Sequence, residues 1–160
     1  RWAKGKRMKH LILKFGMAAL LSSALLSPGG LAKTAKPSKK APAKSAAPKW
    51  LTSHKDALAQ AKKTGKPILI DFSAVWCGPC HMMENEVFKK ASFAPEGKKW
   101  VLLKIDVDKH PDLASHYNAE SLPMLVALTP KGRPASRQPG YGGYNYTMNW
   151  VKSAYKKAKK

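Results

Sequence analysis

Apolar and polar positions divide the chain into two parts. Residues 1–49 contain one apolar run and otherwise little that could pack into a core. Residues 50–160 alternate between apolar runs and turn signals throughout. About 110 residues are enough to bury a core and fold independently. We therefore expect one globular domain over residues 50–160, preceded by segments of a different kind.

Helix signals recur along residues 50–160. Ser53 and Asp56 form a capping-box pattern, and the helix that they begin is expected to end at Gly65. Apolar residues at helical spacing predict further helices over about 78–90, 111–117 and 144–159.

Strand signals lie between these helices. Residues 68–72 form a short, continuous apolar run, which is typical of a strand buried on both faces. Residues 100–107 and 122–129 are further β-like runs, and residues 133–141 are expected to return as a hairpin strand after a turn. The resulting order of elements indicates an α/β fold around one central mixed β-sheet flanked by helices.

The apolar run near the N-terminus has the layout of a targeting segment. After Met8 come a basic start, a run of about a dozen apolar residues over 15–26, and the small-residue pattern Gly30-Leu31-Ala32. The run is short for a membrane span, which needs about 20 apolar residues. We expect residues 1–32 to be a signal peptide or an N-terminal anchor, and the protein to be exported, to the bacterial periplasm.

Residues 33–49 have a third composition, dominated by Ala, Lys, Pro and Ser with no large apolar side chain. Such a segment buries too little surface to offset the entropy of ordering it. It predicts a flexible linker, extended by the repulsion between its lysines.

The net charge of +21 is unevenly distributed. Residues 1–49 contain 12 Lys or Arg and no acid, and residues 50–160 contain the other 18 together with all nine acids. Basic surfaces attract nucleic acids and anionic membranes. The sequence has no Arg-rich reading helix and no RNA-binding aromatic motif, so we expect no specific nucleic-acid partner. Weak attraction of the basic linker to a membrane surface is expected.

The two cysteines, Cys77 and Cys80, are the strongest chemical signal. A cysteine at the start of a helix lies in the field of unpaired N–H groups, which stabilises the nucleophilic thiolate. A second cysteine one turn later can resolve a mixed disulfide. Pro79 suits the first turn of a helix, where its missing N–H costs little. The order of buried strand, turn, cysteine pair and helix therefore favours thiol–disulfide exchange.

Other chemistries use the same spacing. The segment from Cys77 to His81 also fits the C-x-x-C-H pattern of covalent haem attachment, which would make the chain an electron-transfer protein. A zinc site would need two more ligands, for which His110 and His116 are the candidates. The haem pattern lies between a buried strand and a helix of an α/β chain, which leaves little room for a haem pocket. The zinc candidates do not have the spacing of a familiar zinc site, and we expect no metal.

The same residues resemble a known family. The segment from Asp71 to Cys80 resembles the active-site strand and turn of thioredoxins, and Ser121-Leu122-Pro123 resembles their cis-proline segment. The resemblance covers about residues 50–158. It is strongest to exported thioredoxin-like domains such as the C-terminal domain of the thiol:disulfide interchange proteins.

The resemblance implies a fold and a set of roles. Cys77 would be the attacking nucleophile, Cys80 the resolving thiol and Asp71 a buried acid whose pKa is raised by desolvation. The substrate-binding residues would be Trp76, Gly78, Pro79, Leu122 and Pro123. No cofactor beyond the redox-active disulfide would be needed.

Two positions depart from the family pattern. Ser73 stands where many thioredoxins have an aromatic residue. The resemblance places Leu102 where bacterial members carry a lysine near the buried aspartate, and Lys104 is expected to face solvent.

The dipeptide between the cysteines indicates the direction of reaction. Family members with Gly-Pro at this place are mostly reductants, which favours a reductase or isomerase of disulfides in protein substrates. An exported reductant needs a source of electrons, and a membrane-bound donor is expected. The alternative is a non-catalytic thioredoxin-like binding module.

Overall fold

The computed structural model describes residues 48–160. The expected signal peptide or anchor and residues 33–47 of the expected linker lie outside the described residues. Within residues 48–160, no helix is both long and apolar enough to cross a membrane.

Five strands form one mixed sheet in the order β1-β3-β2-β4-β5. Strand β3 runs parallel to β1 and β2, whereas β4 runs antiparallel to both β2 and β5. The α/β fold with a mixed sheet is therefore confirmed, although β1 was not predicted. The bounds are β1 (Trp50–Leu51), β2 (Ile68–Ser73), β3 (Val101–Asp106), β4 (Met124–Leu128) and β5 (Pro134–Pro139).

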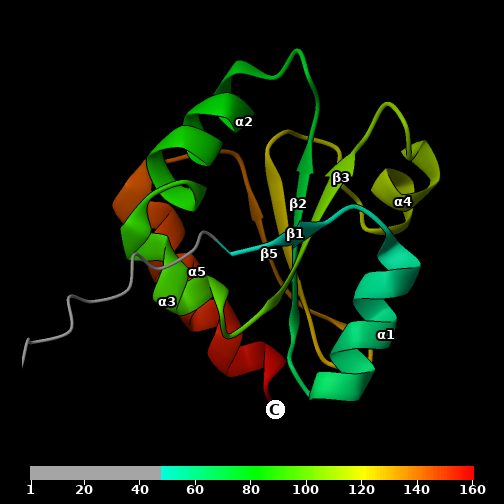
Figure 1. The fold of residues 1–160 in the computed structure, drawn as a ribbon. Coiled ribbons are helices and arrows are strands. Elements are labelled where there is room, and N and C mark those ends of the chain that lie inside the picture. The colour runs from blue at the N-terminus through cyan, green and yellow to red at the C-terminus, as the bar shows by residue number, and fades with distance from the viewer. Residues whose placement is uncertain (1–47) are drawn as a thin grey trace, which may run out of the picture. The chain divides into compact units, whose positions relative to one another are not determined.

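Helices cover both faces of the sheet (Figure 1), with α1 and α4 on one face and α2, α3 and α5 on the other. The first helix begins and ends where the sequence predicts. The Ser53 side chain accepts a hydrogen bond from the Asp56 N–H (3.2 Å), and Gly65 ends the helix at a φ of 67°. The bounds are α1 (His54–Thr64), α2 (Gly78–Met83), α3 (Ala94–Gly97), α4 (Pro111–His116) and α5 (Tyr144–Ala158).

The helix expected over residues 78–90 is not one regular α-helix. After α2 the chain widens into the π-helical turn η1 (Glu84–Phe88) and then forms the short 3-10 helix η2 (Ala91–Phe93) before α3. The Lys89 N–H donates to the Glu84 carbonyl, five residues back, which is the π-type hydrogen bond. Val87 and Phe88, at the end of this turn, are buried in the core.

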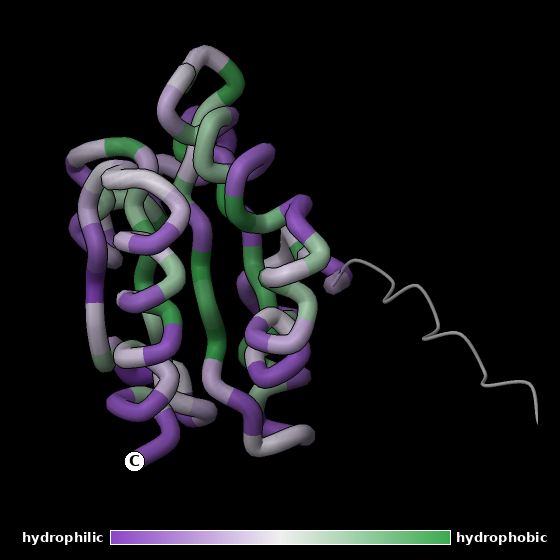
Figure 2. Tube along the Cα trace, turned by 90° about the vertical axis from the view of Figure 1, so that its left-hand side faces the viewer, coloured by the Kyte–Doolittle hydropathy of each residue, from purple (hydrophilic) through white to green (hydrophobic). Residues whose placement is uncertain are grey.

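The sheet separates two hydrophobic clusters. Side chains alternate along β2, so that Leu69 packs under α2 and α5, whereas Ile70 and Phe72 pack under α1 and α4. Figure 2 shows the apolar strands at the centre of the fold, between helices of mixed hydropathy. Asp71 shares the face of Leu69 and is the one acid in β2. This strand leads directly to the cysteine pair.

Candidate active site

The two cysteines form a disulfide just beyond the C-terminal end of β2. The S–S distance is 2.00 Å and the Cα atoms are 5.3 Å apart. Cys77 is the N-cap residue of α2, and its Sγ accepts a hydrogen bond from the Cys80 N–H (3.2 Å). Pro79 occupies the first turn of α2. The end of β2 and the start of α2 thus hold the Cys77 sulfur where a backbone N–H group stabilises a thiolate.

Asp71 lies within the sheet and is 2% exposed. Among residues 48–160 its Oδ1 has no hydrogen-bond partner, so this oxygen does not cap the backbone of the described domain. Burial raises the pKa of Asp71 to about 7. The positive charge of Lys104 opposes this rise and the negative charge of Glu84 adds to it. A carboxyl group with this pKa gains and loses its proton near neutral pH.

The expectation that Leu102 takes the place of the lysine near Asp71 is wrong, and Lys104 faces solvent only in part, with 36% of its side chain exposed. The register between β2 and β3 places Lys104 opposite Asp71, and the Lys104 ammonium donates a hydrogen bond to the Glu84 carboxylate. This bond, together with one from Lys89, lowers the pKa of Glu84. The chain therefore places a cation beside the buried acid, and it does so from position 104.

Sequence reasoning missed Glu84, which contacts this cation. Glu84 follows Cys80 by four residues, and this spacing places two side chains on the same face of a helix. That spacing was the signal available in the sequence. Its significance depends on Lys104, which comes from a strand 20 residues away along the chain.

A groove runs beside Cys77. We call it the front groove; its volume is about 400 Å³, and it is lined by Trp76, Cys77, Gly78, Pro79, Val107, Ala119, Glu120 and Leu122. The Trp76 side chain is 68% exposed, and its Nε1–H donates to Asp108 Oδ2 (2.9 Å). The Leu122–Pro123 peptide is cis. Leu122 lines the front groove, whereas Pro123 is buried and its carbonyl accepts a hydrogen bond from the Gly140 N–H.

A second cavity lies on the side of Cys80. We call it the rear pocket; its volume is about 510 Å³, and it is lined by Thr52, Ser73, Ala74, Val75, Cys80, His81, Glu84, Lys104, Asp106, Lys109 and His110. Ser73 is one of the lining residues, at the position where many thioredoxins have an aromatic. Each cysteine therefore has its own cavity, and the rear pocket contains the Glu84–Lys104 pair.

Of the histidines considered as ligands, His81 and His110 line the rear pocket with Cys80, whereas His116 packs against Tyr117. The His81 ring nitrogen Nε2 lies 2.8 Å from the Val75 carbonyl oxygen. Among residues 48–160, no cluster of three or more His, Cys, Asp or Glu side chains is arranged to hold a metal ion.

Comparisons with known proteins agree with this geometry. Residues 49–152 match the family model described as thioredoxin. Thioredoxin Y, a chloroplastic protein of Oryza sativa subsp. japonica, is 34% identical over 158 residues, which cover 96% of this chain and 89% of that protein. A thioredoxin-like protein of Synechocystis sp. is 43% identical over 75 residues, or 47% of this chain and 69% of that protein.

A solved structure also has the same fold. The structure of DsbH oxidoreductase superposes with a TM-score of 0.64 at 24% identity and covers 76% of this chain and 93% of its own. Thioredoxin-type proteins use no cofactor beyond their redox-active disulfide. The matching family model, the relatives and the position of the Cys77–Cys80 pair together show that this chain belongs to the thioredoxin family of thiol–disulfide oxidoreductases.

Proposed function

We propose that this oxidoreductase reduces or isomerises disulfides in exported protein substrates, outside the cytoplasm. The observation that carries the proposal is the position of Cys77, which caps a helix and lines an open groove, while Cys80 lines a separate pocket. Cys77, which lines the front groove, is the cysteine that attacks, and Cys80, which lines the rear pocket, resolves.

In this mechanism the Cys77 thiolate attacks one sulfur of a substrate disulfide. The substrate S–S bond breaks, a mixed disulfide forms, and the leaving sulfur takes up a proton. The Cys80 thiolate then attacks the Cys77 sulfur and releases the second substrate thiol. Two electrons pass to the substrate, and the enzyme is left with the Cys77–Cys80 disulfide.

Asp71 is the base that we assign to the second step. Cys80 must lose its proton before it can attack, and a carboxyl group with a pKa of about 7 can accept this proton near neutral pH. Glu84 and Lys104 line both the rear pocket and a smaller cavity that contains Asp71. The two cavities share these lining residues, which supports proton exchange between Asp71 and solvent past Glu84 and Lys104.

The surface around the disulfide supports a protein substrate. Large apolar side chains that are exposed gather beside the cysteines, namely Val75 (75%), Trp76 (68%) and Met82 (51%). Exposed apolar patches of this kind mark interaction sites. An extended substrate chain would lie in the front groove and pair with the backbone at Leu122, as in strand addition.

The direction and the location of the reaction rest on the sequence. Gly78 and Pro79 between the cysteines favour a reductant, and the segment that begins at Met8 has the pattern of an export signal. In an oxidising compartment the disulfide must be reduced again after each turnover. We therefore propose a membrane-bound protein dithiol as the electron donor.

The experiment that tests this function is a redox titration of the full chain. A reduction potential of the Cys77–Cys80 pair near about −270 mV would support a reductant, whereas a value near about −120 mV would mark an oxidant and contradict the proposed direction. Cys77→Ser should abolish reduction of a protein disulfide, and Cys80→Ser should accumulate mixed disulfides. A wild-type protein without turnover would instead indicate a binding module.

A further inference from the structure

Basic side chains gather at the end of the sheet that lies opposite the disulfide. Strands β2 and β3 begin at this end, and β4, α1 and α5 finish there (Figure 1). Four segments meet at this end, and each contributes exposed Lys or Arg residues. We call their surface the basic pole; it consists of residues 62–66, 96–99, 131–133 and 156–160.

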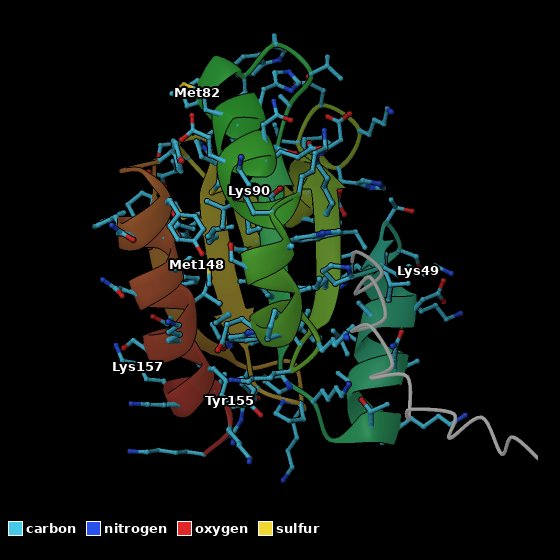
Figure 3. The ribbon with its side chains drawn as sticks, turned by 60° about the vertical axis from the view of Figure 1, so that its left-hand side comes forward. Lys49, Met82, Lys90, Met148, Tyr155 and Lys157 are labelled. Atoms are coloured by element: carbon cyan, nitrogen blue, oxygen red, sulfur yellow. A yellow bond between two sulfur atoms is a disulfide. The ribbon has the colours of Figure 1, made fainter. Side chains whose placement is uncertain are left out.

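Contacts join three of these four segments, namely residues 62–66, 96–99 and 156–160. The Lys66 ammonium donates to the Lys98 carbonyl (2.8 Å), which joins the end of α1 to the end of α3. The ammonium groups of Lys99 and Lys159 lie 5.8 and 5.9 Å from the centre of the Tyr155 ring. In Figure 3, Tyr155 and Lys157 lie at one end of the molecule and Met82, beside the disulfide, lies at the other.

The charge of the domain is concentrated at the basic pole. The pole contains eleven Lys or Arg and one acid, Glu96, which pairs with Lys99 (2.8 Å). The rest of residues 50–160 contains seven Lys or Arg and eight acids. The rest of the domain, which includes the disulfide, is thus close to neutral. The positive charges of the basic pole repel one another, and an anionic partner that binds there would relieve this repulsion.

We propose that the basic pole binds the surface of an anionic phospholipid bilayer, so that the disulfide faces away from the membrane. Ten of its eleven basic residues are lysines, and Arg133 is the exception. Lysine is a hydrated point charge, which suits mobile headgroups. Each Lys or Arg near the surface of an anionic bilayer strengthens the binding of a protein to that bilayer by about fivefold.

The composition of the basic pole fits other anionic partners less well. Proteins that bind single-stranded nucleic acid use exposed aromatic faces, and Tyr155 instead packs edge-on against Trp100 under two ammonium groups. A protein partner would need a buried apolar anchor. The large apolar side chains that are exposed within residues 48–160 all lie off the basic pole; they are Val75, Trp76, Met82 and Tyr146.

The orientation follows from the length of β2. Six residues of strand span about 20 Å, and this distance separates the basic pole from the disulfide end. A molecule bound through the pole therefore keeps the front groove open to soluble substrates. This orientation makes the proposal testable by activity as well as by binding.

The test is co-sedimentation of the full chain with vesicles of phosphatidylglycerol and phosphatidylcholine, compared with phosphatidylcholine alone. Two triple variants remove the same number of exposed charges, and none of the six residues forms an ion pair with another residue of the described domain. The pole variant is Lys63→Gln, Lys131→Gln and Lys156→Gln. The control variant is Lys55→Gln, Lys90→Gln and Arg137→Gln.

We expect the pole variant to weaken binding to the anionic vesicles at least tenfold and the control variant to weaken it less than threefold. The wild-type protein should keep its rate of protein-disulfide reduction when bound. Equal losses in the two variants would show that only net charge matters, and no loss in either would show that these charges do not bind the vesicles; either result would overturn the proposal. The proposal would also be overturned, in favour of a nucleic-acid partner, if the pole variant lost more binding to a duplex DNA oligonucleotide than to the anionic vesicles. Binding does not depend on the proposed redox function, so the two can fail separately.

Discussion

The buried carboxyl group of Asp71 makes the stability of the oxidised protein depend on pH in a calculable way. Burial raises the pKa of Asp71 from 3.8 to about 7. Between these values the folded protein binds more protons than the unfolded chain. The protonated Asp71 therefore makes its full contribution to the free energy of unfolding below about pH 4, and this contribution is lost as the pH rises through 7. Asp71→Asn removes this dependence.

The size of the effect follows from the two pKa values. A tenfold difference in proton affinity is worth about 1.4 kcal/mol, so the ionised Asp71 destabilises the fold by about 4 kcal/mol at pH 8. At pH 5 the same linkage gives about 2 kcal/mol. The gain in stability from Asp71→Asn should thus grow by roughly 2 to 3 kcal/mol between pH 5 and pH 8.

The measurement is urea unfolding of the oxidised wild-type protein and variant across this range, with the disulfide intact so that no thiol titrates. Burying an asparagine amide has its own cost, but this cost does not vary with pH, so the slope isolates the ionisation. Glu120→Gln, which removes an exposed carboxylate, is the matched control and should run parallel to the wild type. Parallel curves for Asp71→Asn and wild type would refute the argument, because they would mean that Asp71 is already ionised at pH 5.

Three further perturbations test other parts of the structure. Lys104→Met removes the cation that opposes the rise in the pKa of Asp71, so the acidic limb of the pH–rate profile for protein-disulfide reduction should move to higher pH. Trp76→Ala should raise KM for a protein disulfide severalfold while changing the unfolding free energy by less than about 0.5 kcal/mol, because the side chain is exposed. An unchanged KM would show that Trp76 does not contact the substrate. Phe93→Ala deletes a fully buried ring and should cost about 4 kcal/mol in urea unfolding.

Most of the fold could be predicted because its signals are local. The run over residues 68–72 is apolar at nearly every position, as a strand buried on both faces must be. The cap at Ser53 and the left-handed Gly65 fix the two ends of α1. Strand β1 has no such signal, because Trp50 and Leu51 are a strand only through their pairing with β3.

The environment of Asp71 could not be predicted by the same means. Leu102 and Lys104 lie on the same face of β3, and only the register with β2 decides which of them stands opposite Asp71. A shift of two residues in the register between β2 and β3 leaves the same side chains on the buried faces. The hydropathy pattern therefore cannot distinguish the two registers. Glu84 could not be assigned for the same reason, since its partner is Lys104.

The uneven distribution of charge gives the folded domain a large electric dipole moment, directed along β2. A field from a charged surface exerts a torque on such a molecule before any contact forms, over roughly the Debye length of about 8 Å at physiological ionic strength. Encounters with anionic surfaces are therefore biased toward one orientation. The nearly neutral end that carries the disulfide exerts little long-range force of its own, and it can meet acidic and basic polypeptides at similar rates.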